Sequence, residues 1–488
     1  MKKLFTLSLV GMSAMGSFAS NKPNIIFILA DDWGWTDWQM NGGEYGSDLY
    51  ETPNLNKLAS EGIYFSQAYA TPLSSPSRAA FMTGKYPGAR LHMHQAITGN
   101  SVFNPIIPEE DKPWKKTCFP QSLNHLPLEE ITIAEELGDG GYETFQLGKW
   151  HLGNKQFYPI NQGFDNQFAV GGAGPGPGGY FAPYKGIDDI KELSEGEYIT
   201  ERLTDEACKL IEAKHESPYF MYLAHYNVHS PYEAKEDLIN KYKAKLAGSK
   251  QTKHINPVMA AMIQSLDESV GKIIKTIEEN GLRDNTVVIV MGDNGGVNWT
   301  GDKKNPNIPV TSNYPLRGGK CNFYEGGVRV PLLIWGNKKL IGENKVNNTP
   351  VHIIDMYPTL LDLAGLAPSK EKDVIDGVSI LPLIKGGTIK ERPIFCHFPR
   401  TTQIDLPVGG SSVRLGDYKL YRFYGLNDDS SDAYKLYNIA KDIHEENNII
   451  NEHKEKAQKM KKMLDEWLKT TGALIPHPNP KYNPKAKK

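Results

Sequence analysis

NIIFILADD, residues 24–32, is an apolar, isoleucine-rich run that ends on two aspartates. Three similar runs follow, namely YFMYLA (219–224), TVVIVM (286–291) and VPLLIWG (330–336). Continuous apolar runs of this length are typical of strands that are buried on both faces. Amphipathic helical patterns lie between them, such as TPNLNKLASEGI (52–63) and MIQSLDESVGKIIKTIEENG (262–281). We therefore predict an α/β fold in which helices flank a large, mostly parallel mixed sheet.

Polar side chains follow the ends of these predicted strands. In chain order they are Asp31, Asp32, Lys149, His151, His225, His229, Asp293 and Asn294. Each one alone is ordinary turn chemistry. In a parallel sheet, however, ligands bind beyond the carboxyl ends of the strands. We therefore expect these side chains to converge at one edge of the sheet.

The oxygen donors in this set predict a metal site. Asp31, Asp32, Asp293 and Asn294 offer carboxylate and amide oxygens, which suit a hard divalent cation, and Ca²⁺ fits better than Zn²⁺. Three carboxylates packed together repel one another and raise one another's pKa values. A bound cation removes that repulsion, which is the physical reason to infer one.

A second notable stretch is LSSPSRAAFMTG (73–84). Its local pattern predicts an ordinary helix start, with Ser75 as the N-cap and Pro76 at the first helical position. Gly84 then ends the helix. The alternative is that one of the three serines is a reaction centre, and the local pattern leaves this open.

The N-terminal residues predict an exported protein. Lys2 and Lys3 precede LFTLSLVGMSAM, and small residues follow, so we expect residues 1–19 to be a bacterial signal peptide and the protein to be periplasmic or secreted. No later run has 18 apolar residues, so no membrane span is expected. The formal net charge of −2 argues against a nucleic-acid partner. The four cysteines form no CxxC motif, and isolated thiols and one disulfide both remain open.

Within the 488 residues, we expect a catalytic domain over 20–385 and a C-terminal subdomain over 386–488. Short strand patterns followed by one helical pattern predict a small antiparallel sheet with a helix on it. The Pro- and Lys-rich tail from residue 473 is expected to be extended or partly disordered. The loop GGAGPGPGGYFAPY (171–184) either rims a pocket, with Tyr180 or Tyr184 stacking on a bound ligand, or is a plain surface loop.

Five blocks, in this order along the chain, resemble the sulfatase family of the alkaline-phosphatase-like superfamily. Ser74-Ser75-Pro76-Ser77-Arg78 matches the family's [Cys/Ser]-x-Pro-x-Arg signature. The other blocks are GKWHLG, VHSPY, GDNGG and LRGGKCNFYEGGVRVP. The resemblance runs from about Asn24 to about Ile384 and favours the arylsulfatase-A-like and N-acetylgalactosamine-sulfatase-like branch. It implies an alkaline-phosphatase-like fold.

The resemblance also implies a modified residue. In the family, the position of Ser74 is converted to formylglycine (3-oxoalanine), an aldehyde that is hydrated in the active enzyme. One hydroxyl of the hydrate attacks sulfur, and the second loses a proton so that sulfate is expelled. A serine rather than a cysteine at this position implies a serine-type maturase as partner. Residue 74 would also contribute an oxygen to Ca²⁺ beside the four donors named above.

The remaining roles follow from the resemblance by position. Arg78 and Lys149 would hold the hydrate, and Asp293 would accept the proton of the attacking hydroxyl. His151 would be the base for the second hydroxyl, and His229 and Lys320 would bind sulfate and protonate the leaving alkoxide. The placement before Ser230-Pro231 favours His229 over His225, which is left as a substrate contact. Further substrate contacts are expected in GARLHMHQAI, at Arg90, His92 and His94.

The expected function is hydrolysis of sulfate esters on sulfated glycans, of galactose, N-acetylgalactosamine or other amino-sugar type, from glycosaminoglycans or mucins. One alternative is a phosphodiesterase or phosphonate hydrolase of the same superfamily, which typically calls for a second metal site with extra His and Asp ligands. The other is a non-catalytic relative that binds sulfated glycans and keeps Ser74 unmodified.

Overall fold

The computed structural model describes residues 22–486 apart from 46, 98–111, 172–177, 192, 302–305, 344, 370–373, 401–407 and 428. The expected signal peptide, residues 1–19, lies outside the described residues. So does most of the glycine- and proline-rich part of the 171–184 loop.

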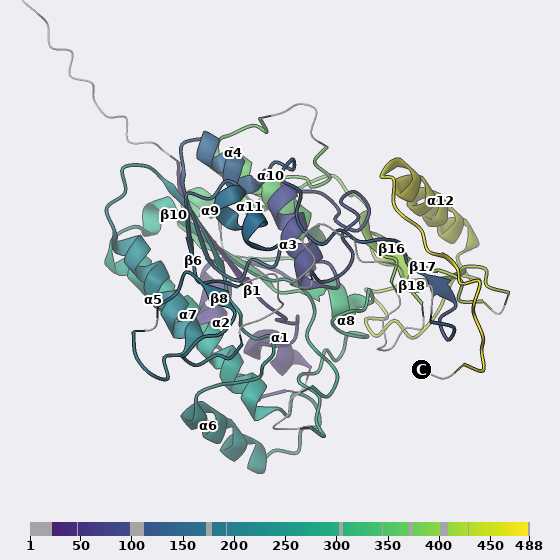
Figure 1. Ribbon diagram of the computed structural model, residues 1–488, viewed down its shortest axis with the longest axis horizontal. Helices are drawn as coiled ribbons and strands as arrows, with labels where there is room; N and C mark the ends of the chain where they lie inside the picture. Colours follow the sequence, from purple (N-terminus) through teal and green to yellow (C-terminus); the bar gives the residue numbers. More distant parts are fainter. Residues whose placement is uncertain are drawn as a thin grey trace, which may run out of the picture.

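An eight-stranded mixed sheet forms the centre of the molecule (Figure 1). Its spatial order is β13 (Lys345–Asn347), β2 (Ile63–Phe65), β12 (Leu332–Gly336), β10 (Thr286–Gly292), β1 (Asn24–Ala30), β9 (Tyr219–Ala224), β5 (Glu143–Gly148) and β6 (Asn166–Phe168). β12 is antiparallel to both neighbours, whereas every other pair is parallel. The predicted α/β class is confirmed, and the carboxyl ends of β1, β5, β9 and β10 share one edge.

Helices cover both faces of this sheet (Figure 1). Successive side chains of β1 belong to two different apolar clusters, with Ile25 and Phe27 on one face and Ile26 and Ile28 on the other. This is why the strand is apolar throughout. The first face carries α3 (Ser74–Thr83), α4 (Ile133–Asp139), α10 (Met356–Ala364) and α11 (Leu381–Ile384). The second face carries α2 (Pro53–Glu61), α5 (Ile199–Glu212), α6 (Glu236–Ala247) and α7 (Pro257–Glu279).

Shorter elements connect these layers. They are α1 (Gln39–Glu44), β3 (Ala68–Tyr69), β4 (Thr117–Cys118), β7 (Val170–Gly171), β8 (Ile187–Asp188), α8 (Glu325–Val328), β11 (Arg329–Val330), α9 (Lys338–Ile341) and β14 (Val351–His352), with 3₁₀ turns at Lys155–Phe157, Pro159–Asn161, Arg283–Asn285 and Ile353–Asp355.

A second, antiparallel sheet lies at the C-terminal side (Figure 1). It consists of β15 (Ile394–Phe398), β16 (Gly410–Leu415), β17 (Tyr418–Phe423) and β18 (Ala433–Asn438), with α12 (Lys454–Thr470) packed on it. Trp467 of α12 stacks on Phe395 of β15 with ring centroids 4.4 Å apart. The predicted antiparallel sheet with one helix is therefore confirmed.

The C-terminal tail is ordered by long-range pairing. β19 (His477–Pro478) pairs antiparallel with β4, and Asn479 donates from its side chain to the carbonyls of Lys112 and Lys115, at 3.0 Å each. Of the two alternatives predicted for the tail, an extended chain and partial disorder, the structure shows an extended segment over the described residues 473–486, because strand pairing and a buried asparagine fix the chain.

The start of α3 also differs from the prediction. The helix begins at Ser74 with Leu73 as its N-cap residue, and Pro76 is its third residue. The Ser75 hydroxyl does not cap the helix but accepts from the backbone N–H of Ile97 at 3.1 Å. The helix ends as expected, at Gly84 with φ 66°.

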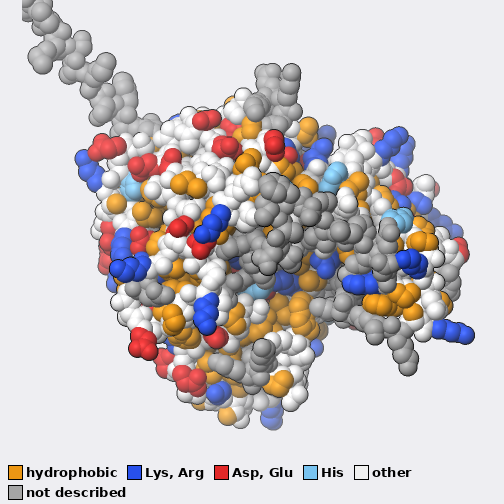
Figure 2. Space-filling view, in the orientation of Figure 1, with side chains coloured by type: hydrophobic (Ala, Val, Ile, Leu, Met, Phe, Trp, Pro, Cys, Tyr) orange, Lys and Arg blue, Asp and Glu red, His pale blue; other side chains and the backbone are white. Residues whose placement is uncertain are grey.

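Three further findings concern the chain as a whole. All four cysteines are free thiols. Among the described residues, no helix combines the length and the apolar character that crossing a bilayer requires. Acidic and basic side chains are interspersed over the face shown in Figure 2, in line with a net charge near zero.

Candidate active site

Two parallel strands bring three carboxylates together. Asp31 and Asp32 follow β1, and Asp293 follows the neighbouring β10. The backbone N–H of Asp32 donates to Asp293 Oδ1 at 3.0 Å. One oxygen from each carboxylate lies within 4.8 Å of the other two, and all three residues are buried. The convergence expected at this edge is therefore present.

The first residue of α3 reaches into this cluster. The Ser74 hydroxyl donates to Asp31 Oδ1 at 2.8 Å and lies 3.2 Å from Asn294 Oδ1. The Asn294 amide nitrogen donates to Asp32 Oδ1 at 2.8 Å, so its carbonyl oxygen is the atom turned toward Ser74. Five oxygen-bearing side chains thus surround one small volume.

Three cations balance the three carboxylates. Arg78, fully buried one turn after Ser74, places Nη2 at 3.0 Å from Asp293 Oδ2. Lys149 follows β5 and forms an ion pair with Asp31. Lys320 Nζ lies 2.7 Å from Asp32 Oδ1.

Two histidines complete the group. His229 places Nε2 3.8 Å from Asp32 Oδ2. The His151 Nε2 atom lies 3.0 Å from the carbonyl oxygen of Ile97, while its buried Nδ1 has no hydrogen-bond partner among the described residues. His151 therefore has one ring nitrogen fixed and one available.

Burial and neighbouring charge separate the acidities of the carboxyl groups. Burial acts to raise the pKa of Asp31, but the positive charges of Lys149, His229 and Arg78 together outweigh it and the pKa is lowered. In Asp293, burial and the negative charge of Asp31 raise the pKa above its ordinary value. Asp293 is therefore the member of the cluster that holds a proton most readily.

Burial and neighbouring charges also shift the pKa values of the basic groups. Burial lowers the pKa of Lys149 to about 8. Burial, followed by the positive charge of Lys149, holds the pKa of His151 well below its usual range, so the imidazole is neutral. Burial and then Lys320 lower the pKa of His229. In Lys320, burial acts against the charged form, but the negative charges around it, chiefly Asp32 and Asp31, together outweigh burial and raise the pKa.

The backbone at the strand ends is unusual where the site residues sit. Asp32 has φ 61° and His151 has φ 59°, both in the left-handed region that side chains other than glycine seldom adopt. Gly148 ends β5 with φ 90°, and a Cβ on it would lie 2.2 Å from the carbonyl oxygen of Ala224. This glycine lets β5 approach β9 closely enough to deliver Lys149. Clustered outliers of this kind are typical of functional sites.

The donor set fits a calcium ion. The carboxylates of Asp31, Asp32 and Asp293, the amide oxygen of Asn294 and the Ser74 hydroxyl are all hard oxygen ligands in one buried volume. Burial and the negative charge of Asp31 raise the pKa of Asp293, and a bound cation would offset both effects by stabilising the charged carboxylate. We conclude that this group of residues can hold a divalent cation.

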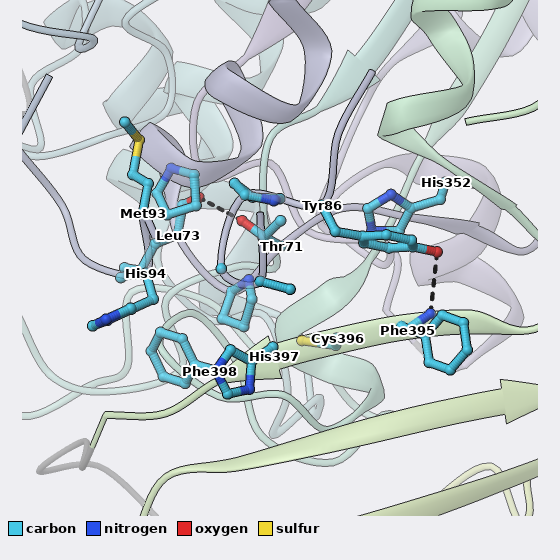
Figure 3. A pocket seen from close by; sticks show the side chains of 15 residues that line it. Thr71, Leu73, Tyr86, Met93, His94, His352, Phe395, Cys396, His397 and Phe398 are labelled. Atoms are coloured by element: carbon cyan, nitrogen blue, oxygen red, sulfur yellow. Dashed lines mark hydrogen bonds between the residues drawn. The ribbon is translucent and has the colours of Figure 1, made fainter. Parts of the chain in front are cut away.

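Three of the predicted substrate contacts point elsewhere. Arg90 Nε forms an ion pair with Asp376 Oδ1 at 2.7 Å, and His92 Nε2 lies 3.1 Å from the Gly472 carbonyl. His94 is buried in a pocket between α3 and β15 (Figure 3), where burial lowers its pKa to about 3. Its Nε2 lies 3.2 Å from the carbonyl of Gln121. A substrate-binding role for these three residues stays a prediction.

Two further expectations need correction. His225 is fully buried and its Nε2 lies 2.9 Å from the Ser269 hydroxyl of α7, so a substrate contact does not fit its position. Tyr180 is also fully buried, and its hydroxyl donates to the carbonyls of Tyr226 and His229 at 2.5 and 2.8 Å. Tyr180 therefore supports the backbone of His229 and cannot stack on a sugar. Tyr184 is half-buried, and its hydroxyl donates to the Glu197 carbonyl at 2.9 Å.

Sequence reasoning missed other residues of the site. Tyr222 lies in β9, and its hydroxyl accepts from Arg78 Nη1 at 3.4 Å. The carbonyl of Asn227 accepts from the backbone N–H of Asp31 at 2.7 Å. The run YFMYLA (219–224) holds Tyr219 and Phe220 as well, so its pattern does not single out Tyr222, and a backbone acceptor leaves no trace in the sequence.

Comparison with known proteins agrees with this geometry. A family model described as Sulfatase matches residues 23–366, and one described as N-sulphoglucosamine sulphohydrolase, C-terminal, matches residues 319–472. The chain is 31% identical to a sulfatase of Formosa agariphila over 92% of this chain and 89% of that protein. It is also 31% identical to the mouse N-acetylgalactosamine-6-sulfatase, over 86% and 75%.

Solved structures give the same result. The crystal structure of Ps i-CgsB in complex with k-i-k-neocarrahexaose is 29% identical, with a TM-score of 0.72, over 92% of this chain and 93% of that chain. The phosphonate monoester hydrolase of Agrobacterium radiobacter, at 17% identity and a TM-score of 0.63, shares the fold alone. On these matches the chain belongs to the sulfatase family and is an enzyme that hydrolyses sulfate esters.

Proposed function

We propose that this sulfatase removes sulfate from sulfated glycans, using a formylglycine formed from Ser74 together with Ca²⁺. The observation that carries the proposal is the Ser74 hydroxyl, which lies 2.8 Å from Asp31 in a buried group of three carboxylates and three cations. An unmodified serine in an ordinary helix start does not need such surroundings.

The relatives support the class of substrate. One is named for N-acetylgalactosamine, and a solved relative is in complex with k-i-k-neocarrahexaose. We propose a sulfated sugar of galactose or N-acetylgalactosamine type, or another amino sugar from glycosaminoglycans or mucins, as substrate of this chain.

The two groups expected at the site have distinct chemistry. Ca²⁺ would be held by Asp31, Asp32, Asp293, Asn294 and an oxygen of residue 74, and it supplies positive charge that polarises the sulfate and acidifies a bound hydroxyl. A hydrated formylglycine supplies one hydroxyl as nucleophile and a second through which sulfate is expelled. Because the position is a serine, we propose that a serine-type maturase forms the aldehyde.

Side chains of the chain itself then move the protons. Asp293 accepts the proton of the attacking hydroxyl at a carboxylate oxygen. His151 is neutral, and its Nδ1 has no hydrogen-bond partner in the described part of the chain, so it accepts the proton of the second hydroxyl. Arg78 and Lys149 hold residue 74 and balance the charge of the carboxylates.

Departure of the sugar needs a proton on its oxygen. His229 and Lys320 flank Asp32 from different loops, at 3.8 and 2.7 Å, and both carry N–H groups suited to a sulfate oxygen. We assign them to binding sulfate and to protonating the leaving alkoxide.

Organisation and location are part of the proposal. The antiparallel sheet from β15 onward is taken as a C-terminal subdomain that closes one side of the site, with the boundary near 385. With residues 1–19 as a signal peptide, the enzyme would act in the periplasm or outside the cell, where sulfated polysaccharide fragments reach it.

A substrate panel tests the proposal. The protein is co-expressed with a serine-type maturase, supplied with Ca²⁺, and given monosulfated galactose, N-acetylgalactosamine and glucosamine and sulfated glycosaminoglycan disaccharides. We expect sulfate release confined to one sulfate position and absent in Ser74→Ala. Phosphate release from diesters without sulfate release, or binding of sulfated glycan without turnover, would contradict it.

A further inference from the structure

Lys320 stands in a compact turn that α8 closes. The N–H of Gly326 in α8 donates to the carbonyl of Arg317 at 2.8 Å, on the other side of Lys320. The N–H of Lys320 donates to the Gly296 carbonyl at 3.0 Å, and the N–H of Gly295 donates to the Gly327 carbonyl at 3.0 Å. The turn is therefore bonded at both ends to the loop that carries Asp293 and Asn294.

The backbone of this turn is packed so closely that two of its contacts leave no room for a Cβ atom. A Cβ on Gly295 would lie 1.8 Å from the carbonyl oxygen of Gly326. A Cβ on Gly327 would lie 1.8 Å from the carbonyl oxygen of Asn322. Backbone in such close contact moves as one body, so a displacement of α8 also displaces Lys320.

The C-terminal sheet holds α8 through a buried charge. Glu325, the first residue of α8, is fully buried and accepts from Lys419 Nζ and from the Tyr69 hydroxyl, at 2.7 Å each. Lys419 belongs to β17, and its side chain is only 3% exposed. A cation of the C-terminal sheet is thus fixed on the helix that closes the Lys320 turn.

A second carboxylate ties the same helix from the other side. Glu445, which follows β18, accepts from the backbone N–H of Glu325 at 2.9 Å and from the Tyr421 hydroxyl. The Glu445 carbonyl accepts from Arg317 Nη1 at 2.8 Å. The C-terminal part of the chain therefore contacts the Lys320 turn before and after the lysine.

We propose that Glu325, Lys419 and Glu445, here called the Glu325 network, are positioning residues that set Lys320 against Asp32 for catalysis. Buried ion pairs are weak evidence for stability, since apolar replacements of similar size often fold as well. Their directional contacts, by contrast, fix one position of α8. The inference rests on the proposed role of Lys320 in sulfate binding and proton donation.

The first test measures the turn itself and does not depend on activity. Lys419→Met keeps the length of the side chain and removes the charge. Arg422→Met is the matched control, since Arg422 lies on the same strand and pairs instead with Asp432 and Asp465, at 2.7 and 3.0 Å. We expect amide hydrogen exchange in the peptide covering 316–328 to accelerate at least about tenfold in Lys419→Met only. Unchanged exchange, or equal acceleration in both variants, overturns the proposal.

The second test links the network to Lys320 by a double-mutant cycle on matured enzyme. With the sulfated sugar turned over fastest in the panel, Lys419→Met should lower kcat/KM about tenfold or more, and Lys419→Arg should restore most of it. In a Lys320→Ala background, Lys419→Met should change kcat/KM less than about twofold. Equal losses in both backgrounds overturn the proposal.

The two tests also separate this inference from the proposed function. If matured wild-type protein releases sulfate and Ser74→Ala does not, but the cycle shows no coupling, only the positioning role fails. If no sulfate is released by any protein, the proposed function fails, and the exchange experiment still decides whether the network fixes the turn.

Discussion

Arg78 is the cation whose removal should affect the cluster most. Its side chain is fully buried, with Nη2 at 3.0 Å from Asp293 and 3.8 Å from Asp31. Nη1 donates to the Lys149 carbonyl at 3.0 Å. Arg78→Met retains most of the volume but leaves two buried carboxylates short of one positive charge.

The expected loss is large. Removing one partner of a buried ion pair costs about 3–5 kcal/mol of folding free energy, because the remaining charge stays buried without compensation. The lost hydrogen bond to Lys149 adds about 1 kcal/mol. Without Ca²⁺, Arg78→Met should therefore lower the free energy of unfolding by about 4 kcal/mol or more. The cluster also gains one net negative charge, so Ca²⁺ should stabilise Arg78→Met more than wild type.

Urea unfolding in EDTA and in excess Ca²⁺, with midpoint and slope compared, measures both effects. Arg283→Met is the matched control, because Arg283 pairs with Glu278 at 2.6 Å but its side chain is 41% exposed. An exposed pair of this kind contributes about 0–1 kcal/mol. If Arg78→Met lost no more unfolding free energy than Arg283→Met, the cluster would not be a buried group of charges that compensate one another.

Three further predictions address neighbouring features. Gly295→Ala should lower the free energy of unfolding by about 1–3 kcal/mol and remove most of the activity, because the added Cβ would meet a backbone carbonyl. Gly248→Ala, which has open space around it, should leave the free energy of unfolding unchanged in the same urea titration. Burial raises the pKa of Glu445 to about 7, so the folded state keeps a proton that the unfolded state releases near pH 4.5. The free energy of unfolding should therefore fall by up to about 3 kcal/mol as the pH rises through this window. In thermal unfolding from pH 5 to 8, Glu445→Gln should show a flatter dependence of stability on pH than wild type, and a steeper one would contradict the assignment. His225→Gln should leave kcat/KM within about twofold of wild type, whereas His229→Gln should lower it by roughly 10²-fold or more, and equal losses would contradict the roles given to the two histidines.

Much of the fold was predictable because the strands are uninterrupted apolar runs. A run such as residues 24–30 has few alternatives to a buried parallel strand, and the aspartates that follow it must then emerge at the edge of the sheet. The neighbouring run that ends at Asp293 pairs directly with it. The carboxylate cluster therefore follows from local pattern and sheet topology together.

Other features depend on contacts that no local pattern records. The tail from residue 473 looks disordered by composition, yet it pairs with β4 more than 350 residues earlier in the chain. His225 and His229 lie four residues apart in similar surroundings, and only the path of the loop sends one toward α7 and the other toward Asp32. Tyr180 can be buried because its hydroxyl bonds to the carbonyls of Tyr226 and His229, which lie more than 40 residues further along the chain.

Residue 74, once oxidised, is the reaction centre that we propose. The most direct measurement uses preparations made with different amounts of maturase. In each one, the fraction of the Ser74 peptide that is lighter by two hydrogens is compared with the initial rate of sulfate release. We expect the rate of sulfate release to be proportional to the converted fraction and unconverted protein to release no sulfate. Equal rates at all degrees of conversion, or none from fully converted protein on any sulfated sugar, would contradict it.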